Sequence, residues 1–183
     1  MIRISYTDML LVISIIWILV RVIINLKNKN TDWKREFQLM LVYISIIVVA
    51  RFVFFPFEKI NDEIQPLIFD KEKMSPLNVN LSPMIHLLDY VVAGEATLNI
   101  VGNTTMFIPI GIIWPIVFKE LNTPVKALAA GAAFSLLIEI VQLPFYDRVS
   151  DVDDLILNSF GYVIGYLVYI GIKNIRKIRR NKK

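Results

Sequence analysis

Residues 124–172 read PVKALAAGAAFSLLIEIVQLPFYDRVSDVDDLILNSFGYVIGYLVYIGI. Two apolar runs, Pro124–Phe145 and Leu155–Ile172, flank a short connection that is rich in charges and amides. A helix that crosses a bilayer needs about 20 predominantly apolar residues. The two runs reach or approach that length, so this stretch predicts two membrane-spanning helices joined by a polar segment.

Three further apolar runs of similar length precede this stretch, namely Met9–Leu26, Phe37–Phe57 and Asn99–Phe118. Hydrophobic residues make up 56% of the 183 residues, and the mean hydropathy is +0.58. A soluble domain carries its apolar residues in short periodic runs, whereas this chain carries them in long blocks. The sequence therefore predicts an all-α, polytopic membrane helix bundle with about five transmembrane helices.

The connection between the second and third spans, Glu58–Leu98, is too long for a tight turn. Apolar residues recur at helical spacing within Ser82–Val92, which opens with a Ser-Pro pair typical of a helix start. This pattern predicts an extracellular amphipathic helix at the outer membrane interface. The single histidine, His86, lies in it, and both a solvated position and a catalytic one remain open for this side chain.

The distribution of Lys and Arg predicts the orientation of the chain. Thirteen of the 20 lie after the first span, after the third span and in the C-terminal segment 173–183, while five lie in the opposite connections. Positive residues favour the cytoplasmic side of a membrane. We therefore expect the N-terminus outside and the C-terminus in the cytoplasm, with the basic tail 173–183 attracting anionic lipids rather than nucleic acid.

The sequence shows no internal repeat, and it contains no cysteine. Disulfides, cysteine-based zinc sites and cysteine nucleophiles are therefore excluded. The first apolar run lacks a small-residue cleavage site, which favours a retained helix over a removed signal peptide. We expect residues 1–183 to form a single membrane domain.

Polar side chains gather near the predicted outer ends of the spans, where contact with hydrocarbon makes them costly. They are the expected ligand-binding residues of a site open to the cell exterior: Arg51, Asn103, Glu139, Gln142, Arg148, Asp151, Asp154 and Asn158. Arg51 and Glu139 each lie about six residues before the outer end of their helix, or ~9 Å deep at ~1.5 Å per residue. Their matched depth predicts an ion pair.

Each of these residues also has a structural interpretation. The acids of the segment Ser150–Asp154 would stabilise a helix N-terminus, and Ser150 with Asp153 resembles a capping box. Asn103 and Asn158 would hydrogen-bond between helices. Arg148 would hold a phosphate or carboxylate in a fork, or pair with a neighbouring aspartate. The acids lack the spacing of a calcium-binding loop, so we predict no metal site and no cofactor.

Four short elements resemble motifs of the VanZ-like family, in the family's order. They are NLSP at 80–83, NIVGNTTMFIPIG at 99–111, IEIVQ at 138–142 and RVSDVDDLILNSFGYVIGY at 148–166. The resemblance covers roughly residues 80–172. The sequence departs from the family at Met84, where phenylalanine is common. This departure weakens the resemblance only for the predicted amphipathic helix.

The resemblance implies a small multi-pass protein of the bacterial plasma membrane. The family's name-giving member is associated with resistance to teicoplanin, a glycopeptide antibiotic with a lipid tail, and no reaction is established for the family. The resemblance points to these positions: Asn103, Phe107, Pro109, Gly111, Glu139, Gln142, Arg148, Asp151, Asp154, Asn158 and Gly161.

Two functions of different classes remain open. The outer site would bind a lipid-linked cell-wall intermediate, another membrane lipid or the antibiotic itself, and so contribute to teicoplanin-type resistance. Alternatively, the chain is a membrane-embedded enzyme that modifies a lipid-linked envelope substrate, with Glu139 as the base and Arg148 holding the phosphate. Transport is disfavoured, because the inner halves of the spans are almost purely apolar.

Overall fold

The computed structural model describes residues 2–28, 31–55, 59–73, 79–83, 93–146 and 148–181. The chain forms two compact units. Unit 1 comprises Met1–Asn78 and Gln142–Val149, and unit 2 comprises Val79–Val141 and Ser150–Lys183. The amphipathic helix predicted around Met84 lies outside the described residues.

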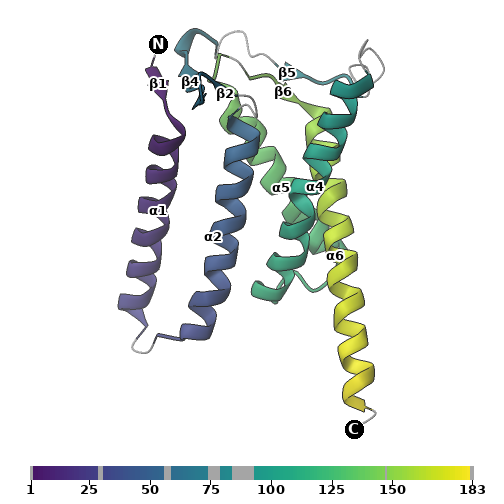
Figure 1. Cartoon of the computed structure of the whole chain (residues 1–183). Helices are drawn as coiled ribbons and strands as arrows, with labels where there is room; N and C mark the ends of the chain where they lie inside the picture. Colours follow the sequence, from purple (N-terminus) through teal and green to yellow (C-terminus); the bar gives the residue numbers. More distant parts are fainter. Residues whose placement is uncertain are drawn as a thin grey trace. The chain divides into compact units, whose positions relative to one another are not determined.

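Among these described residues, five helices are long and apolar enough to cross a membrane, which confirms the predicted all-α fold class. They are α1 (Tyr6–Lys27), α2 (Trp33–Phe54), α4 (Ala93–Val117), α5 (Pro124–Gln142) and α6 (Val152–Asn181) (Figure 1). The segment 173–183, predicted as a basic tail, continues α6 as helix through Asn181.

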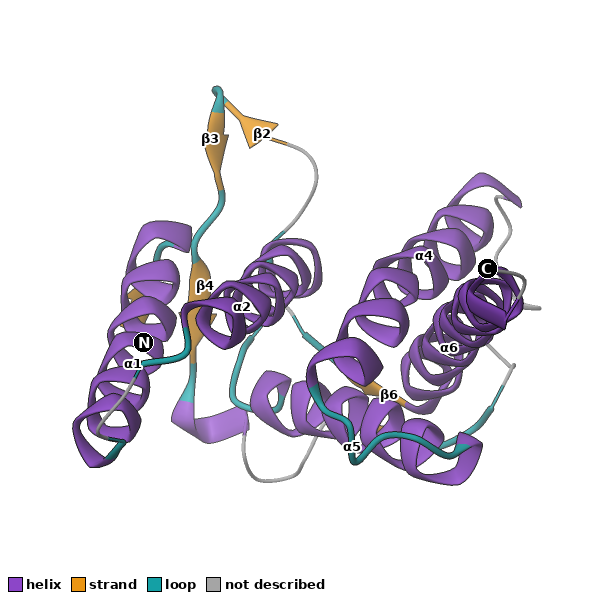
Figure 2. Cartoon of the chain, turned by 90° about the horizontal axis from the view of Figure 1, so that it is seen from below, coloured by secondary structure: helices purple, strands orange, loops and turns teal. Residues whose placement is uncertain are grey.

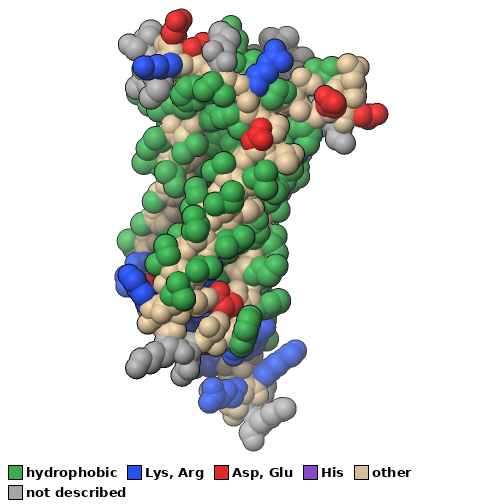
Figure 3. Space-filling view, turned by 90° about the vertical axis from the view of Figure 1, so that its left-hand side faces the viewer, with side chains coloured by type: hydrophobic (Ala, Val, Ile, Leu, Met, Phe, Trp, Pro, Cys, Tyr) green, Lys and Arg blue, Asp and Glu red, His purple; other side chains and the backbone are tan. Residues whose placement is uncertain are grey.

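Unit 1 contains α1 and α2. Both helices begin with a side-chain cap, because Ser5 and Asp8 form a reciprocal capping box and Asp32 accepts two backbone N–H groups of the next turn. The two helices are linked by a 2.7 Å hydrogen bond between Ser14 and Tyr43. Helix α1 contains no buried residue, and hydrophobic side chains cover the face that it presents in Figure 3.

Short strands join the helices. In unit 1, β1 (Ile2–Ile4) pairs antiparallel with β4 (Leu67–Phe69), and β2 (Lys59–Ile60) forms a hairpin with β3 (Glu63–Ile64). Asn61 and Asp62 form the two-residue turn with φ of 54° and 63°, the left-handed conformation that such hairpins require. In unit 2, β5 (Val79–Asn80) pairs in parallel with β6 (Ser150–Asp151). A 3₁₀ turn covers Lys71–Lys73.

Unit 2 is built on the close approach of α4 and α6, which run side by side in the same direction (Figures 1 and 2). A methyl group added at Gly161 would clash with the carbonyl oxygen of Thr104, and one added at Gly165 would clash with that of Ile108. Small residues four apart permit such contact between membrane helices. Helix α4 thus fills the space beside Gly161 and Gly165.

The core of unit 2 is aromatic. Tyr162 is fully buried, and its ring lies against Gly131 of α5, where a Cβ atom would overlap it. The ring of Trp114 lies 5.0 Å from that of Phe134 and 6.2 Å from that of Tyr162, measured between centroids. This packing fixes α4, α5 and α6 around one another and places the ends of α5 and α6 that carry the predicted polar residues.

Candidate functional site

The candidate site of unit 2 lies where α5 ends and α6 begins. Glu139 of α5 has 4% of its surface exposed. Its Oε2 atom accepts hydrogen bonds from the backbone N–H of Asp151 at 2.9 Å and from the hydroxyl of Ser150 at 3.2 Å. Strand β6 therefore supplies both donors that hold this buried carboxyl group.

Asp151 is the residue that caps α6. Its Oδ1 atom accepts the backbone N–H of Asp153 at 2.8 Å, and its Oδ2 atom accepts the side-chain amide of Asn80 at 3.0 Å. The sequence-based assignment of Ser150 as the cap is wrong, because α6 begins at Val152 and Ser150 donates its hydroxyl to Glu139 instead. The pairing of β5 with β6 brings Asn80 to this position.

A second set of hydrogen bonds joins α4 to α6. The side-chain amide of Asn103 lies 2.6 Å from Oδ1 of Asp154 and 2.7 Å from Oδ1 of Asn99. Asn99 and Asn103 are four residues apart, so they share one side of α4. Because one amide carries two N–H donors, Asn103 holds both oxygen atoms at once.

Asn158 lies deeper in the bundle, with 1% of its surface exposed. Its amide donates to the hydroxyl of Ser135, a fully buried residue of α5, at 3.0 Å. This bond matches the interhelical role that the sequence analysis kept open for Asn158. Asn158 thus joins α5 to α6 beneath the carboxylates.

The electrostatic character of this site is negative. The partners of Glu139, Asp151 and Asp154 are amides, a hydroxyl and backbone N–H groups. Within the described part of unit 2, none of these three carboxyl groups forms an ion pair with a lysine or arginine. The same part of the chain contains no group of three or more His, Cys, Asp or Glu side chains placed to hold a metal ion.

The remaining predicted residues lie in unit 1, at the end of α2. The side chains of Gln142, Arg148 and Arg51 donate to the backbone carbonyls of residues 53, 54 and 55 at 3.4, 2.8 and 3.1 Å. The last carbonyls of a helix lack partners within it, and a cation there also complements the helix dipole. The three side chains therefore act together as a C-terminal cap of α2.

The predicted ion pair of Arg51 with Glu139 joins residues of different units and stays a prediction. Within unit 1, the guanidinium of Arg51 lies 5.7 Å from the centre of the Tyr6 ring and 5.8 Å from that of Phe52. Cation–π contacts of this length stabilise a partly buried guanidinium.

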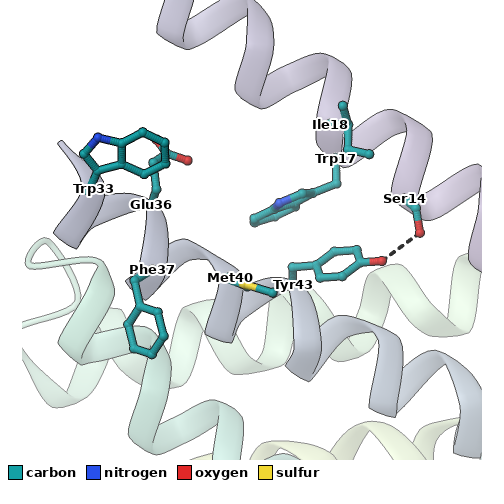
Figure 4. A pocket seen from close by; sticks show the side chains of 8 residues that line it. All are labelled: Ser14, Trp17, Ile18, Trp33, Glu36, Phe37, Met40 and Tyr43. Atoms are coloured by element: carbon teal, nitrogen blue, oxygen red, sulfur yellow. Dashed lines mark hydrogen bonds between the residues drawn. The ribbon is translucent and has the colours of Figure 1, made fainter. Parts of the chain in front are cut away.

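A pocket between α1 and α2 in unit 1 was not predicted. It has a volume of about 530 Å³. Its wall contains Trp17, Trp33, Phe37 and Tyr43, and the Ser14 hydroxyl meets that of Tyr43 at one edge (Figure 4). Glu36, which also lines it, is bound by Arg21 in an ion pair. The wall is mostly apolar, which suits hydrocarbon.

The sequence analysis also missed two residues of the unit 2 site, namely Asn80 and Ser135, as contributors of hydrogen bonds. Two signals were available. Ser135 lies one helical turn before Glu139 in an otherwise apolar run, so the two share a helix face. Asn80 begins the NLSP element that carries the family resemblance.

A family model described as VanZ/LLP1 matches residues 9–174 of the 183. The match includes the described residues of the unit 2 site and those at the end of α2, and it confirms the resemblance drawn from the four motifs. Comparisons with curated proteins and with solved structures gave no match. The match covers most of the chain. The described part of the chain contains five helices that are long and apolar enough to cross a membrane. The chain is therefore a membrane protein that belongs to the VanZ/LLP1 family.

Proposed function

We propose that the chain binds the headgroup of a lipid-linked envelope component, or of a related amphiphile, in the outer half of the bacterial plasma membrane. The observation that carries this proposal is the gathering of Glu139, Asp151 and Asp154 with the amides of Asn80 and Asn103 inside one helical unit. By retaining such a ligand, the protein contributes to resistance against antibiotics of the teicoplanin type.

The energetics of the membrane support a functional site. A carboxyl group within a membrane-spanning segment is costly, and such groups commonly mark ligand or ion pathways. Glu139 and Asp154 lie in segments long and apolar enough to span the bilayer. Bundle stability alone would be served as well by apolar side chains of similar volume.

The charge of the site determines which headgroup it suits. Carboxylates and amide oxygens accept hydrogen bonds, and their negative charge opposes phosphate. Sugar hydroxyls and amines donate hydrogen bonds and fit such acceptors. The ligand class that we propose is therefore a glycosylated or amine-bearing lipid, recognised through its donors.

A phosphate-binding role for Arg148 has less support. Its guanidinium donates to the carbonyl of Phe54 at 2.8 Å and caps α2, which already accounts for the position of the charge. Arg148 lies in unit 1, so it enters neither the description of the carboxylate site nor the proposal built on it.

The enzyme alternative rests on one contact. The hydroxyl of Ser150 lies 3.2 Å from Oε2 of Glu139, a distance at which a carboxylate can accept a proton from a nucleophile. Ser150 and Glu139 are both buried, with 8% and 4% of their surfaces exposed. A substrate would therefore have to enter the bundle before this pair could act on it.

The experiment measures binding and turnover together. The purified full-length chain in lipid nanodiscs is titrated with teicoplanin and with a lipid-linked disaccharide wall precursor. Asp154→Asn keeps the side-chain shape, and we expect it to weaken binding by about tenfold or more, because a hydrogen bond to a charged group contributes ~1.5–3 kcal/mol.

Asp32→Asn is the matched control, because it also removes one carboxylate near a helix start and asparagine caps a helix as well as aspartate does. It should bind like the unchanged protein. Equal binding by both variants, or binding of neither ligand, contradicts the proposal. A mass change in the lipid substrate that is lost in Glu139→Gln would establish the enzyme instead.

A further inference from the structure

A second pocket in unit 2 lies at the far end of the bundle from the carboxylates. It has a volume of about 560 Å³ and is lined by the last turns of α4, by the connection that follows α4, and by α6. Its polar lining residues are Lys119, Asn122, Tyr169, Lys173 and Arg176, and its apolar ones are Ile112, Pro115, Ile116 and Ile172. The family resemblance assigned no role to any of these residues.

The polar side of this pocket is positively charged. Lys119 belongs to the connection after α4. Lys173 and Arg176 are three residues apart on α6, so their side chains lie on one side of that helix. The described lining contains three cations and no carboxylate. The ammonium group of Lys173 lies 5.7 Å from the centre of the Tyr169 ring, which orders it at the pocket wall.

The other side of the pocket is apolar and lies on the exposed outer surface of α4 and α6. Ile116 is 46% exposed and Ile172 is 40% exposed, although both belong to helices that can cross a membrane. The pocket therefore joins a cluster of cations to a surface suited to hydrocarbon. A free phosphate ion would use the cations alone, whereas a phospholipid would use both sides.

We propose that this pocket binds the phosphate headgroup of one anionic phospholipid, with an acyl chain lying along Ile116 and Ile172. Lys119, Lys173 and Arg176 contact the phosphate, and Asn122 adds an amide donor. Basic pockets between membrane helices bind anionic headgroups in this way. The site differs from a general attraction of the basic tail, because it needs the connection after α4 as well as α6.

The pocket also has a structural consequence. Lys119 and Asn122 precede α5, so a lipid bound to them and to α6 would tie the start of α5 to the neighbouring helix. Bound lipid should therefore raise the thermal stability of the protein, since a ligand that binds only the folded state stabilises it.

The test is native mass spectrometry of the full-length chain in detergent, titrated with dioleoyl phosphatidylglycerol or with dioleoyl phosphatidylcholine. We expect the anionic lipid to bind more tightly. The double variant Lys173→Gln, Arg176→Gln should weaken its binding by about thirtyfold, because a basic residue near an anionic lipid contributes about fivefold.

The matched control is Lys177→Gln, Arg179→Gln, which removes the same charge from the same helix outside the pocket. It should change lipid affinity by less than about threefold. Lys119→Gln, in the connection rather than on the helix, supplies a second pocket variant and should weaken binding by about fivefold.

Three outcomes would overturn the proposal. Equal losses in the pocket and control variants would assign lipid binding to the diffuse charge of the C-terminal segment. Equal affinity for the two lipids would exclude recognition of the anionic headgroup. Displacement of the lipid by millimolar inorganic phosphate would show that the cations bind a free anion and that the apolar wall adds nothing.

Discussion

At the scale of the residue, a polar side chain of this protein can have a partner other than the one that its local sequence favours. Ser150 has the position of a helix cap in the sequence, yet the cap is Asp151, because the hydroxyl of Ser150 is bound to Glu139. Arg148, one of the predicted ligand-binding residues, donates to a helix-terminal carbonyl. A buried acceptor needs a hydrogen-bond donor, and the packing of the fold determines which donor is close enough to supply that bond.

The predicted ion pair of Arg51 with Glu139 is tested by a double-mutant cycle. If the two side chains pair, Arg51→Leu or Glu139→Leu alone should lower the free energy of unfolding by about 3–5 kcal/mol, because each leaves a buried charge uncompensated. The double variant should recover most of that loss. Thermal unfolding in detergent provides the measurement, and losses that simply add would show that the two residues do not interact.

At the scale of the element, the contact between α4 and α6 depends on glycine. Gly161 and Gly165 let two helix backbones meet where any side chain would collide with a carbonyl oxygen. This contact holds α4 against α6 close to the bond between Asn103 and Asp154, since Asn103 adjoins Thr104 and Asp154 lies seven residues before Gly161. The polar site is therefore positioned by residues that carry no functional group.

This dependence predicts a contrast between glycines of the same helix. Gly161→Ala should lower the free energy of unfolding by about 1–3 kcal/mol, which is the usual cost of overpacking a tight contact. Gly171→Ala is the control, because nothing lies within 4 Å of a Cβ atom placed there. It should leave stability unchanged or raise it by up to ~1 kcal/mol through helix propensity. Similar melting temperatures for both variants would contradict the assigned contact.

At the scale of the whole molecule, the two proposed binding sites require opposite ends of unit 2 to face opposite sides of the membrane. The carboxylate site lies at the start of α6, whereas the basic pocket lies beyond Tyr169 on the same helix. A helix rises ~1.5 Å per residue, so the 15 residues from Asp154 to Tyr169 span ~22 Å, most of the hydrocarbon thickness of ~30 Å. If α6 crosses the bilayer, we therefore expect each site to meet a different leaflet.

The orientation of the chain is predicted from its basic residues and can be measured with reporters. A reporter enzyme active only in the cytoplasm should work when fused after Lys183, and one active only outside should work when inserted near Lys71. The physical reason is the excess of Lys and Arg at the end of α6. The opposite pattern would place the carboxylate site on the cytoplasmic side and would contradict the proposed function.

The sequence by itself determined the five spans, because a membrane-spanning helix requires a long apolar block. Such a block can be recognised from length and hydropathy alone. It also determined that Asn99 and Asn103 meet, since residues four apart share a helix face. The family followed from short motifs, and the match over residues 9–174 confirms it.

Only the tertiary structure decided which distant groups meet. The pairing of β5 with β6 joins Asn80 to Asp151 across 71 positions, and Arg148 reaches the carbonyl of Phe54 across 94. The parallel contact of α4 with α6 is likewise invisible in the sequence pattern of either helix. The physical reason is that periodicity reports the faces of one element, whereas the choice of donor for each buried acceptor depends on how elements pack.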